Sequence, residues 1–196
     1  MSHEIKSDNI IFVCGMRGSG KTTFVKWLLT QFNIPVVIWD YNWEHKPLGY
    51  VIVHNLTDLQ TAAKTHSKIV YQPTEKTFIH FDNFCALTLR YDNFMLVIEE
   101  IERFATSHSI PPNLKKLIDI GRHKGIGLTC TARRTLRTNP DIPYNANHII
   151  MFKQHRPQDL QYLATFCGED VWKLQTLPDY NYLWYDGKVI TIHSPV

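Results

Sequence analysis

The chain has 196 residues, of which 44% are hydrophobic and 20% are charged, and its formal net charge is +3. This length suits one well-buried domain, so we expect a single domain over residues 1–196. The composition excludes a disordered chain, and no apolar run approaches the roughly 20 residues that a transmembrane helix needs. The segment Met1–Lys6 lacks the apolar core of a secretion signal, which leads us to expect a protein of the cytoplasm.

The four cysteines are widely spaced and form no Cys-x-x-Cys pair, so we expect free buried thiols and no zinc site. Cys14 and Cys130 fall on expected core strands and are potential neighbours, but a disulfide between them would need an unusually oxidising compartment. The ten histidines show no metal-binding spacing and are interpreted as surface residues or as core residues with satisfied hydrogen bonds.

The first third of the chain alternates between strand and helix. Asn9–Cys14 is an apolar run that stops at Gly15, as a buried parallel strand does, and from Lys21 onward apolar residues recur at helical spacing. Val36–Asp40 predicts a second strand. Two short strands and a helix between them are then expected at Tyr50–His54, Lys68–Tyr71 and Leu56–Lys64.

The middle of the chain predicts helices around a third apolar strand. Segment Thr74–Arg90 places apolar side chains on one helical stripe, and Phe94–Ile98 predicts a buried strand. Apolar residues recur at helical spacing over Ile101–His108. The pair Pro111 and Pro112 ends that helix and begins another, whose outward face includes Arg122.

The last third adds strands at Ile126–Thr131 and His148–Phe152 and a helix that begins near Pro157. A hairpin is expected from Tyr182–Tyr185 and Lys188–Ile192, because the intervening Asp-Gly favours a type I′ turn. Strands alternating with helices predict an α/β fold with a mainly parallel central sheet flanked by helices, ending in a β-hairpin.

Residues 15–22 read Gly-Met-Arg-Gly-Ser-Gly-Lys-Thr between the first strand and the first helix, which is the pattern of a phosphate-binding loop. Its glycines let the backbone turn N–H groups toward phosphate oxygens, next to the positive end of the helix dipole. We expect Lys21 to contact the β- and γ-phosphates of ATP and the Thr22 hydroxyl to ligate Mg²⁺. The expected nucleotide-binding residues are Gly15, Met16, Arg17, Gly18, Ser19, Gly20, Lys21, Thr22 and Thr23, with the Arg17 side chain facing solvent.

The third core strand ends in two acids, Glu99 and Glu100, at the sheet edge where the phosphates are expected. The first can hold Mg²⁺ through its water shell, and the second can orient or deprotonate the attacking water. Aspartate is usual at the first position, so Glu99 lengthens that arm by one methylene. The alternative is a pair of exposed acids that simply favour a helix N-terminus.

Residues 115–137 hold seven basic side chains against one acid, a local charge of +6. A solvated basic face explains this as readily as a functional surface. Within it, Ile118–Thr135 resembles the segment that follows the acidic strand in FtsK–HerA superfamily ATPases. In that alignment Arg133 occupies the place of the family's polar sensor, Arg134 matches the next residue, and Thr135 replaces a proline.

The resemblance extends over most of the chain and includes Trp-Asp-Tyr-Asn-Trp-Glu after the second strand, in which Asp40 and Glu44 correspond to further site residues. It implies a RecA-like P-loop NTPase core. The single-domain form is most similar to the genome-packaging ATPases of archaeal turreted icosahedral viruses, which enclose an internal membrane.

This resemblance implies an ATP- and Mg²⁺-dependent motor that moves double-stranded DNA as a homo-oligomeric, usually hexameric, ring. Glu100, Lys21 and Arg133 would act in catalysis, and Arg122 would complete a neighbouring subunit's site. Capsid or membrane-vertex proteins are implied partners, in the host cytoplasm or at the virion vertex. The candidates for DNA contact are Lys115, Lys116, Lys124 and Arg137.

Two other functions are compatible with the phosphate-binding loop. A nucleoside or nucleotide kinase would use residues 133–137 as a basic lid, and a nucleotide-gated assembly protein would bind ATP mainly to oligomerise. A GTPase is disfavoured because the chain has no Asn-Lys-x-Asp motif. The adenine pocket stays open, since Trp39, Tyr41 and Trp43 suit base stacking and core packing equally.

Overall fold

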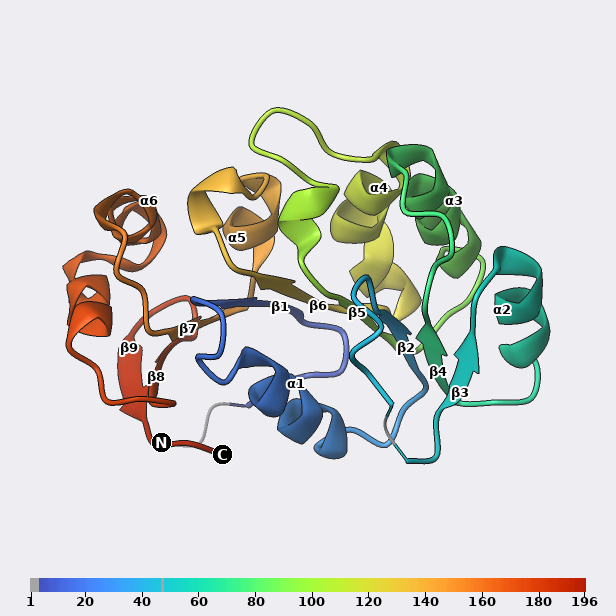
Figure 1. Ribbon diagram of the computed structural model, residues 1–196, viewed down its shortest axis with the longest axis horizontal. Helices are drawn as coiled ribbons and strands as arrows, with labels where there is room; N and C mark the ends of the chain where they lie inside the picture. The colour runs from blue at the N-terminus through green and yellow to red at the C-terminus, as the bar shows by residue number, and fades with distance from the viewer. Residues whose placement is uncertain (1–3, 47) are drawn as a thin grey trace.

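The computed structural model describes residues 4–46 and 48–196, which form a nine-stranded sheet flanked by helices (Figure 1). The strand order is β3-β4-β2-β5-β6-β1-β7-β8-β9; neighbours from β3 to β7 are parallel, and β8 and β9 are antiparallel. The strands are β1 Ile10–Cys14, β2 Val36–Trp39, β3 Val51–Val53, β4 Lys68–Tyr71, β5 Met95–Ile98, β6 Gly127–Ala132, β7 His148–Phe152, β8 Tyr182–Tyr185 and β9 Ile190–His193.

The α-helices are α1 Lys21–Thr30, α2 Leu56–Ala62, α3 Phe78–Thr88, α4 Pro112–Ile120, α5 Asp141–Asn145 and α6 Pro157–Cys167. The described part of the chain also contains four 3-10 helices, η1 Ile101–Arg103, η2 Gly121–Lys124, η3 Thr135–Arg137 and η4 Glu169–Gln175. The structure contains the residues that typically mark the N-terminal ends of helices. Asn55 and Thr77 cap α2 and α3 by accepting a backbone N–H, and Pro112 and Pro157 occupy the first positions of α4 and α6.

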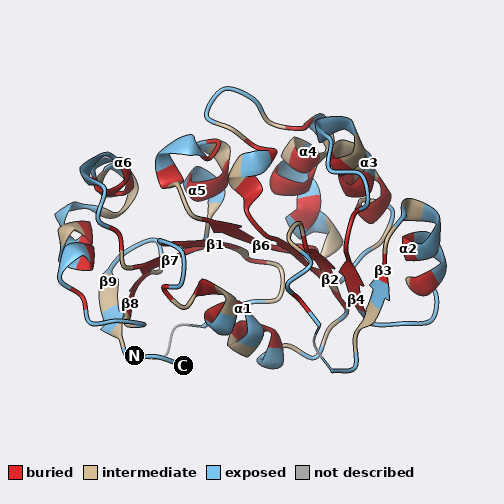
Figure 2. Cartoon of the chain, in the orientation of Figure 1, coloured by how far each residue is buried: buried red, intermediate tan, exposed pale blue. Residues whose placement is uncertain are grey.

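The central strands are buried on both faces, as their continuous apolar runs predict (Figure 2). One face packs against α1 through Phe24, Val25 and Leu28. The opposite face packs against α2, α3, α4 and α6, and Figure 1 shows these helices together on that side. The predicted α/β fold with a RecA-like P-loop NTPase core, a mainly parallel sheet and a C-terminal hairpin is therefore confirmed.

The prediction of a helix over residues 101–108 is wrong. Only the short η1 forms, and Glu100 before it is in the left-handed region with φ 52°. Phe104 is buried by tertiary packing, with its ring centroid 4.2 Å from that of Phe81. Thr106 then bridges to Ser109 and to Thr138, which holds this segment as a loop. Apolar spacing here reflects burial and not a helical face.

Two boundaries also differ from expectation. Arg122 belongs to η2 and not to the outward face of α4. The terminal hairpin pairs Tyr185 with Ile190, which leaves a four-residue loop in place of a two-residue type I′ turn. Asp186 explains the longer loop, because its Oδ1 accepts backbone hydrogen bonds from Lys188 and Val189, each at 3.0 Å.

All four cysteines are free. Cys14 and Cys130 lie on neighbouring strands, but Cys14 is opposite Ala132, two residues further along. Burial raises the pKa of both thiols above the ordinary value. No group of three or more metal-ligating side chains gathers within residues 4–46 and 48–196. None of the helices in these ranges has both the length and the apolar character required to cross a bilayer.

Candidate nucleotide site

The candidate site lies at the carboxyl edge of the parallel sheet, where loops after four strands meet. The phosphate-binding loop follows β1, the Asp40 loop follows β2, Glu99 and Glu100 follow β5, and Arg133 follows β6. The parallel register of β2, β5, β6, β1 and β7 brings all these ends to one edge. Open α/β sheets bind ligands at this edge.

The loop after β1 adopts a curl that only its glycines permit. Gly15, Gly18 and Gly20 have φ values of 153°, 76° and 111°, and a Cβ at Gly15 would lie 2.6 Å from Phe152 Cβ. The Ser19 hydroxyl is buried without a hydrogen-bond partner in the structure. These features fit a loop that receives phosphate oxygens. The Arg17 side chain, within the same loop, is exposed, as predicted for its position.

Lys21 begins α1 and turns its amine back into the loop. Its Nζ donates hydrogen bonds to the carbonyls of Gly15 and Met16 at 2.7 and 2.9 Å. Burial lowers the pKa of Lys21, partly opposed by nearby acids. The backbone N–H groups of Lys21 and Thr22 open the helix and have no acceptor within it. This arrangement suits an anionic ligand at the helix N-terminus.

Glu99 is buried against a histidine that the sequence did not single out. His45 Nε2 lies 2.7 Å from Glu99 Oε1. Burial opposes charge on His45, but Glu99 and Asp40 together raise the pKa of this imidazole. Asp40 Oδ2 accepts hydrogen bonds from the backbone of His45 and from Gln72 at 2.8 and 2.9 Å, whereas the side chain of Glu44 is exposed. Asp40 therefore anchors the loop that carries His45.

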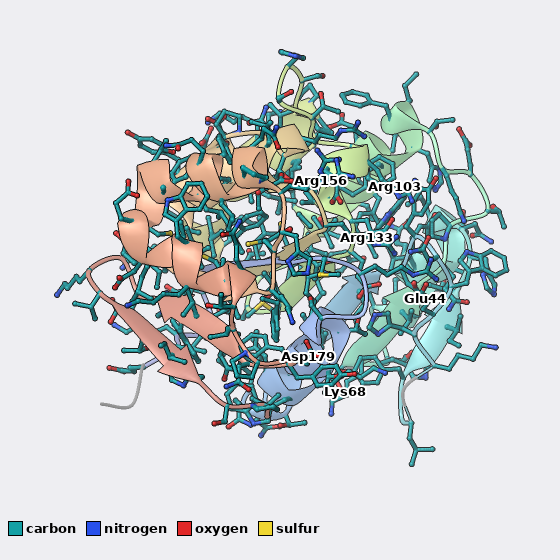
Figure 3. The ribbon with its side chains drawn as sticks, turned by 60° about the vertical axis from the view of Figure 1, so that its left-hand side comes forward. Glu44, Lys68, Arg103, Arg133, Arg156 and Asp179 are labelled. Carbon is teal, nitrogen blue, oxygen red and sulfur yellow. The ribbon has the colours of Figure 1, made fainter. Side chains whose placement is uncertain are left out.

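Glu100 is held by groups from three different loops. Its backbone N–H donates to Thr131 Oγ1 at 3.1 Å. Its carboxylate accepts from Asn42 Nδ2 at 2.9 Å and from Arg103 Nε, and it forms an ion pair with Arg133. Burial raises the pKa of Glu100, but Arg103, Asn42 and Arg133 outweigh it and the net pKa is lowered. Glu100 is therefore a stable carboxylate, and Figure 3 shows the two arginines close together.

Glu102 is a third acid of this cluster that the sequence did not point out. Its Oε1 accepts the backbone N–H of Arg133 at 2.8 Å, and its Oε2 is buried without a hydrogen-bond partner. Burial raises the pKa of Glu102, and Lys21 and Glu100 are close enough to influence it. The structure thus brings Lys21, Glu100 and Arg133 to the same edge of the sheet, and Glu102 binds the backbone of Arg133 there.

Some of the missed residues had a local signal. Arg103 follows Glu100 by three residues, a spacing at which side chains meet on a helical turn. Asn42 lies in the Trp-Asp-Tyr-Asn-Trp-Glu segment, whose acids and aromatic residues were singled out but whose asparagine was not. His45 had no such signal, because its proximity to Glu99 depends on the pairing of β2 with β5.

Arg134 has a structural role, because it binds a buried carboxylate on α6. Its Nε donates to Asp159 Oδ2 at 3.1 Å, and Asp159 is fully buried. Asp159 Oδ1 also accepts from Thr135 Oγ1 and from the backbone of Leu136. These contacts tie η3 to α6 and leave Arg133 as the arginine of this pair that faces the acids.

The aromatic residues after β2 are mostly engaged in packing. Trp39 is fully buried and stacks on Tyr71, with ring centroids 5.3 Å apart. The Arg103 guanidinium lies 4.3 Å from the ring centroid of Tyr41. Trp43 is partly exposed and donates its indole N–H to the carbonyl of Pro73. Packing therefore accounts for Trp39, and Tyr41 supports an arginine of the acidic cluster.

Arg122 lies outside the site of its own chain. It precedes β6, and its Nε lies 3.7 Å from Asp8 Oδ2, which precedes β1. Both residues are therefore at the amino edge of the sheet, opposite the phosphate-binding loop. The Arg122 side chain is 77% exposed and is free to reach another molecule.

The four candidates for DNA contact do not share one edge. Lys124 lies at the amino edge and pairs with Asp92 at 2.6 Å, whereas Arg137 is exposed at the carboxyl edge in η3. Lys116 is exposed on α4. Lys115, also on α4, is bound by two carboxylates, those of Asp119 at 2.8 Å and Asp141 at 3.2 Å.

Comparisons with known proteins identify the family and the fold of the chain. Residues 3–139 match the family model described as AAA domain, and no curated protein matches the chain. The genome packaging NTPase B204 from Sulfolobus turreted icosahedral virus 2, in complex with ATP-gammaS, is similar with a TM-score of 0.85 and 23% identity, covering 98% of this chain and 100% of that chain.

Two further structures extend the comparison. B204, the DNA-packaging ATPase from Sulfolobus turreted icosahedral virus, has a TM-score of 0.81 and 25% identity, over 98% of this chain and 100% of that chain. VirB4 of Thermoanaerobacter pseudethanolicus has a TM-score of 0.69 and 11% identity, over 95% of this chain and 88% of that chain. The resemblance to packaging ATPases of archaeal turreted icosahedral viruses, predicted from the motifs, is confirmed.

Proposed function

The chain belongs to the AAA-domain family, and we propose that it is an ATP-hydrolysing motor that translocates double-stranded DNA during packaging of a viral genome. The observation that carries this proposal is the cluster of Lys21, Glu100 and Arg133 beside the phosphate-binding loop. The similarity to proteins named as genome-packaging ATPases supports DNA as the partner.

Each residue of the cluster has a role in this proposal. Lys21 exchanges its two carbonyl acceptors for β- and γ-phosphate oxygens when ATP enters. Thr22 would supply a hydroxyl ligand to Mg²⁺ and Glu99 would hold the ion through its water shell, and the ion would neutralise charge on the phosphate oxygens. Glu100 orients or deprotonates the attacking water, and its lowered pKa keeps it ionised for that purpose.

Arg133 links the nucleotide to Glu100. In the structure its guanidinium is paired with Glu100, and Glu102 fixes its backbone. A γ-phosphate beside Lys21 would compete with Glu100 for this guanidinium. If the guanidinium exchanged Glu100 for the γ-phosphate, its positive charge would lie against the transferred group. A carboxylate oxygen of Glu100 would then be free to bind water.

The proposal includes a ring of identical chains, in which Arg122 acts on a neighbouring subunit's nucleotide. The position of Arg122 at the amino edge supports this role, because the residue is remote from its own loop and exposed. Lys116 and Arg137 are the candidates for DNA contact without a paired carboxylate among the described residues. Capsid or membrane-vertex proteins are the proposed further partners, in the host cytoplasm or at the virion vertex.

The test is the DNA-stimulated ATPase activity of Glu100→Gln. We expect turnover to fall by about 100-fold or more, because the amide cannot accept a proton from water, while ATP binding is retained. Glu75→Gln is the matched control, since that carboxylate is 60% exposed on another loop. Unchanged turnover in Glu100→Gln would exclude its catalytic role, and an ATPase indifferent to DNA would exclude the motor.

A further inference from the structure

The acidic cluster defines which way a bound nucleotide runs. Glu100 and Arg133 follow β5 and β6, on one side of β1, and mark the γ-phosphate end. The α-phosphate, ribose and base must then extend to the other side of β1, toward β7 and β8. At the start of α1 this direction leads past Thr23. Figure 3 shows Asp179, from the turn before β8, well separated from Arg103 and Arg133.

An aromatic hollow lies in that direction. It has a volume of about 90 Å³ and is lined by Gly20, Thr23, Phe152, Tyr180, Tyr182, Pro195 and Val196. A second hollow of about 320 Å³ adjoins the outer side of the phosphate-binding loop and is lined by Met16, Ser19, Lys153, His155, Asp179 and Tyr180. Tyr180 is the residue that borders both hollows.

The ring of Tyr180 is held against the loop by an unfavourable backbone conformation. The Asn181 N–H donates to the Pro178 carbonyl at 3.2 Å, which closes a turn with Tyr180 at its third position. Its φ is 65°, a value that favours glycine and is costly for a bulky residue. Lys153 anchors the turn through Asp179 at 2.7 Å.

This conformation leaves the ring both close to the loop and accessible. A Cβ at Gly20 would lie 3.5 Å from Tyr180 Cδ1, so the ring borders the phosphate-binding backbone. The residue is nevertheless 57% exposed, as a surface that receives a ligand must be. Strained backbone at a ligand site is a recurring feature of proteins.

We propose that Tyr180 is the base-stacking residue of this site and that it receives the purine of a nucleoside triphosphate beside Thr23 and Tyr182. The inference rests on the proposed function and adds the base-binding half of the site. The hollow is lined by apolar, aromatic and hydroxyl groups, with no charged side chain among the described residues. Recognition by the face of the ring does not distinguish purines, so ATP and GTP should bind with similar affinity.

The experiment measures equilibrium binding of ATP, GTP and inorganic tripolyphosphate to the full chain without DNA. Tyr180→Gly removes the ring and relieves the positive φ, so the variant should fold at least as well as the parent. We expect its Kd for ATP and GTP to rise by about 5- to 150-fold, the value of one base–aromatic stack, with tripolyphosphate binding unchanged. Tyr180→Phe should bind as the parent does, and Tyr144→Ala on α5 is the exposed-tyrosine control.

Three results would overturn the proposal. They are unchanged ATP affinity in Tyr180→Gly, an equal loss of tripolyphosphate affinity, or a preference for ATP over GTP greater than about tenfold in the parent. The outcome is separable from that of the motor hypothesis because no hydrolysis or DNA is involved. An ATPase that ignores DNA but loses ATP affinity in Tyr180→Gly would reject the motor and retain the base site.

Discussion

At the scale of single residues, charge in the site is balanced by neighbours from separate loops. Glu100 is buried, and a buried carboxylate is costly unless it is paired and hydrogen-bonded. Asn42, Arg103 and Arg133 supply those partners from the segments after β2, β5 and β6. The same contacts that stabilise the carboxylate also decide when it is available to a water molecule.

Arg133→Ala tests this dual role. The variant loses the cation proposed to face the γ-phosphate, and we expect turnover to fall by about 100-fold, comparable to the loss of one transition-state donor. ATP affinity should change less than about threefold, because Lys21 and the loop backbone remain. Single-turnover hydrolysis and equilibrium binding would separate the two effects.

The control for this measurement is Arg90→Ala, an exposed arginine just beyond α3. Arg133→Lys is informative beside it, since lysine retains the charge without the planar fork and should recover part of the activity. If Arg133→Ala hydrolyses ATP at the parental rate, the guanidinium has no role in the chemical step.

At the scale of elements, local signals were sufficient for the strands and the larger helices but not for the segment after β5. Runs such as Ile10–Cys14 and His148–Phe152 are apolar because both faces of a parallel strand are buried, so the pattern and its cause coincide. Over Ile101–His108 the apolar spacing came from Phe104 packing on Phe81. Periodicity cannot distinguish these two origins.

The entry of β6 offers a prediction at this scale. Gly127 begins the strand, and a Cβ there would lie 2.1 Å from the Ser7 carbonyl oxygen and 2.8 Å from Met95 Cε. Because the first of these neighbours is backbone, Gly127→Ala must displace the segment before β1, and we expect a loss of about 3 kcal/mol in the free energy of unfolding.

Chemical denaturation of Gly127→Ala beside Gly121→Ala would check this. Gly121 has φ −54°, and an added Cβ there would lie no closer than 3.4 Å to a neighbour, so its substitution should change the free energy of unfolding by no more than about 1 kcal/mol. Equal losses in the two variants would mean that the close approach at β6 is not what requires glycine.

At the scale of the whole molecule, the two edges of the sheet carry different parts of the proposed machine. The phosphate-binding loop and Glu100 lie at the carboxyl edge, and Arg122 lies at the amino edge beside Asp8. No rotation of the Arg122 side chain can bring it to its own loop across the length of the strands. A catalytic role for Arg122 therefore requires a second copy of the chain.

Mixing two inactive variants tests that requirement. Arg122→Ala keeps an intact nucleotide site, and Lys21→Ala keeps an intact arginine. If the arginine acts on a neighbour, each variant alone should be inactive, and an equal mixture in a heterologous ring should recover about a quarter of parental turnover. Normal ATP binding by Arg122→Ala, measured in parallel, confirms that its own site is intact.

If mixed rings form, as verified by native mass, but do not recover ATPase turnover, Arg122 has another role. Parental turnover in Arg122→Ala alone would have the same meaning. Arg90→Ala serves as the control, because Arg90 is an exposed arginine outside the nucleotide site.

The sequence by itself determined the features whose causes are local. Neighbouring residues determine the glycine-rich curl before Lys21 and Thr22. They also determine the strand that ends at Glu99 and Glu100 and the alternation of strands and helices that predicts a parallel sheet. Only the tertiary structure decided that His45 faces Glu99, that Arg133 and Arg103 clamp Glu100, and that Tyr180 borders the loop. Except for the contact of Arg103, these contacts join residues that are far apart in the chain. The order and register of the strands bring those residues together, and no local sequence pattern encodes either one.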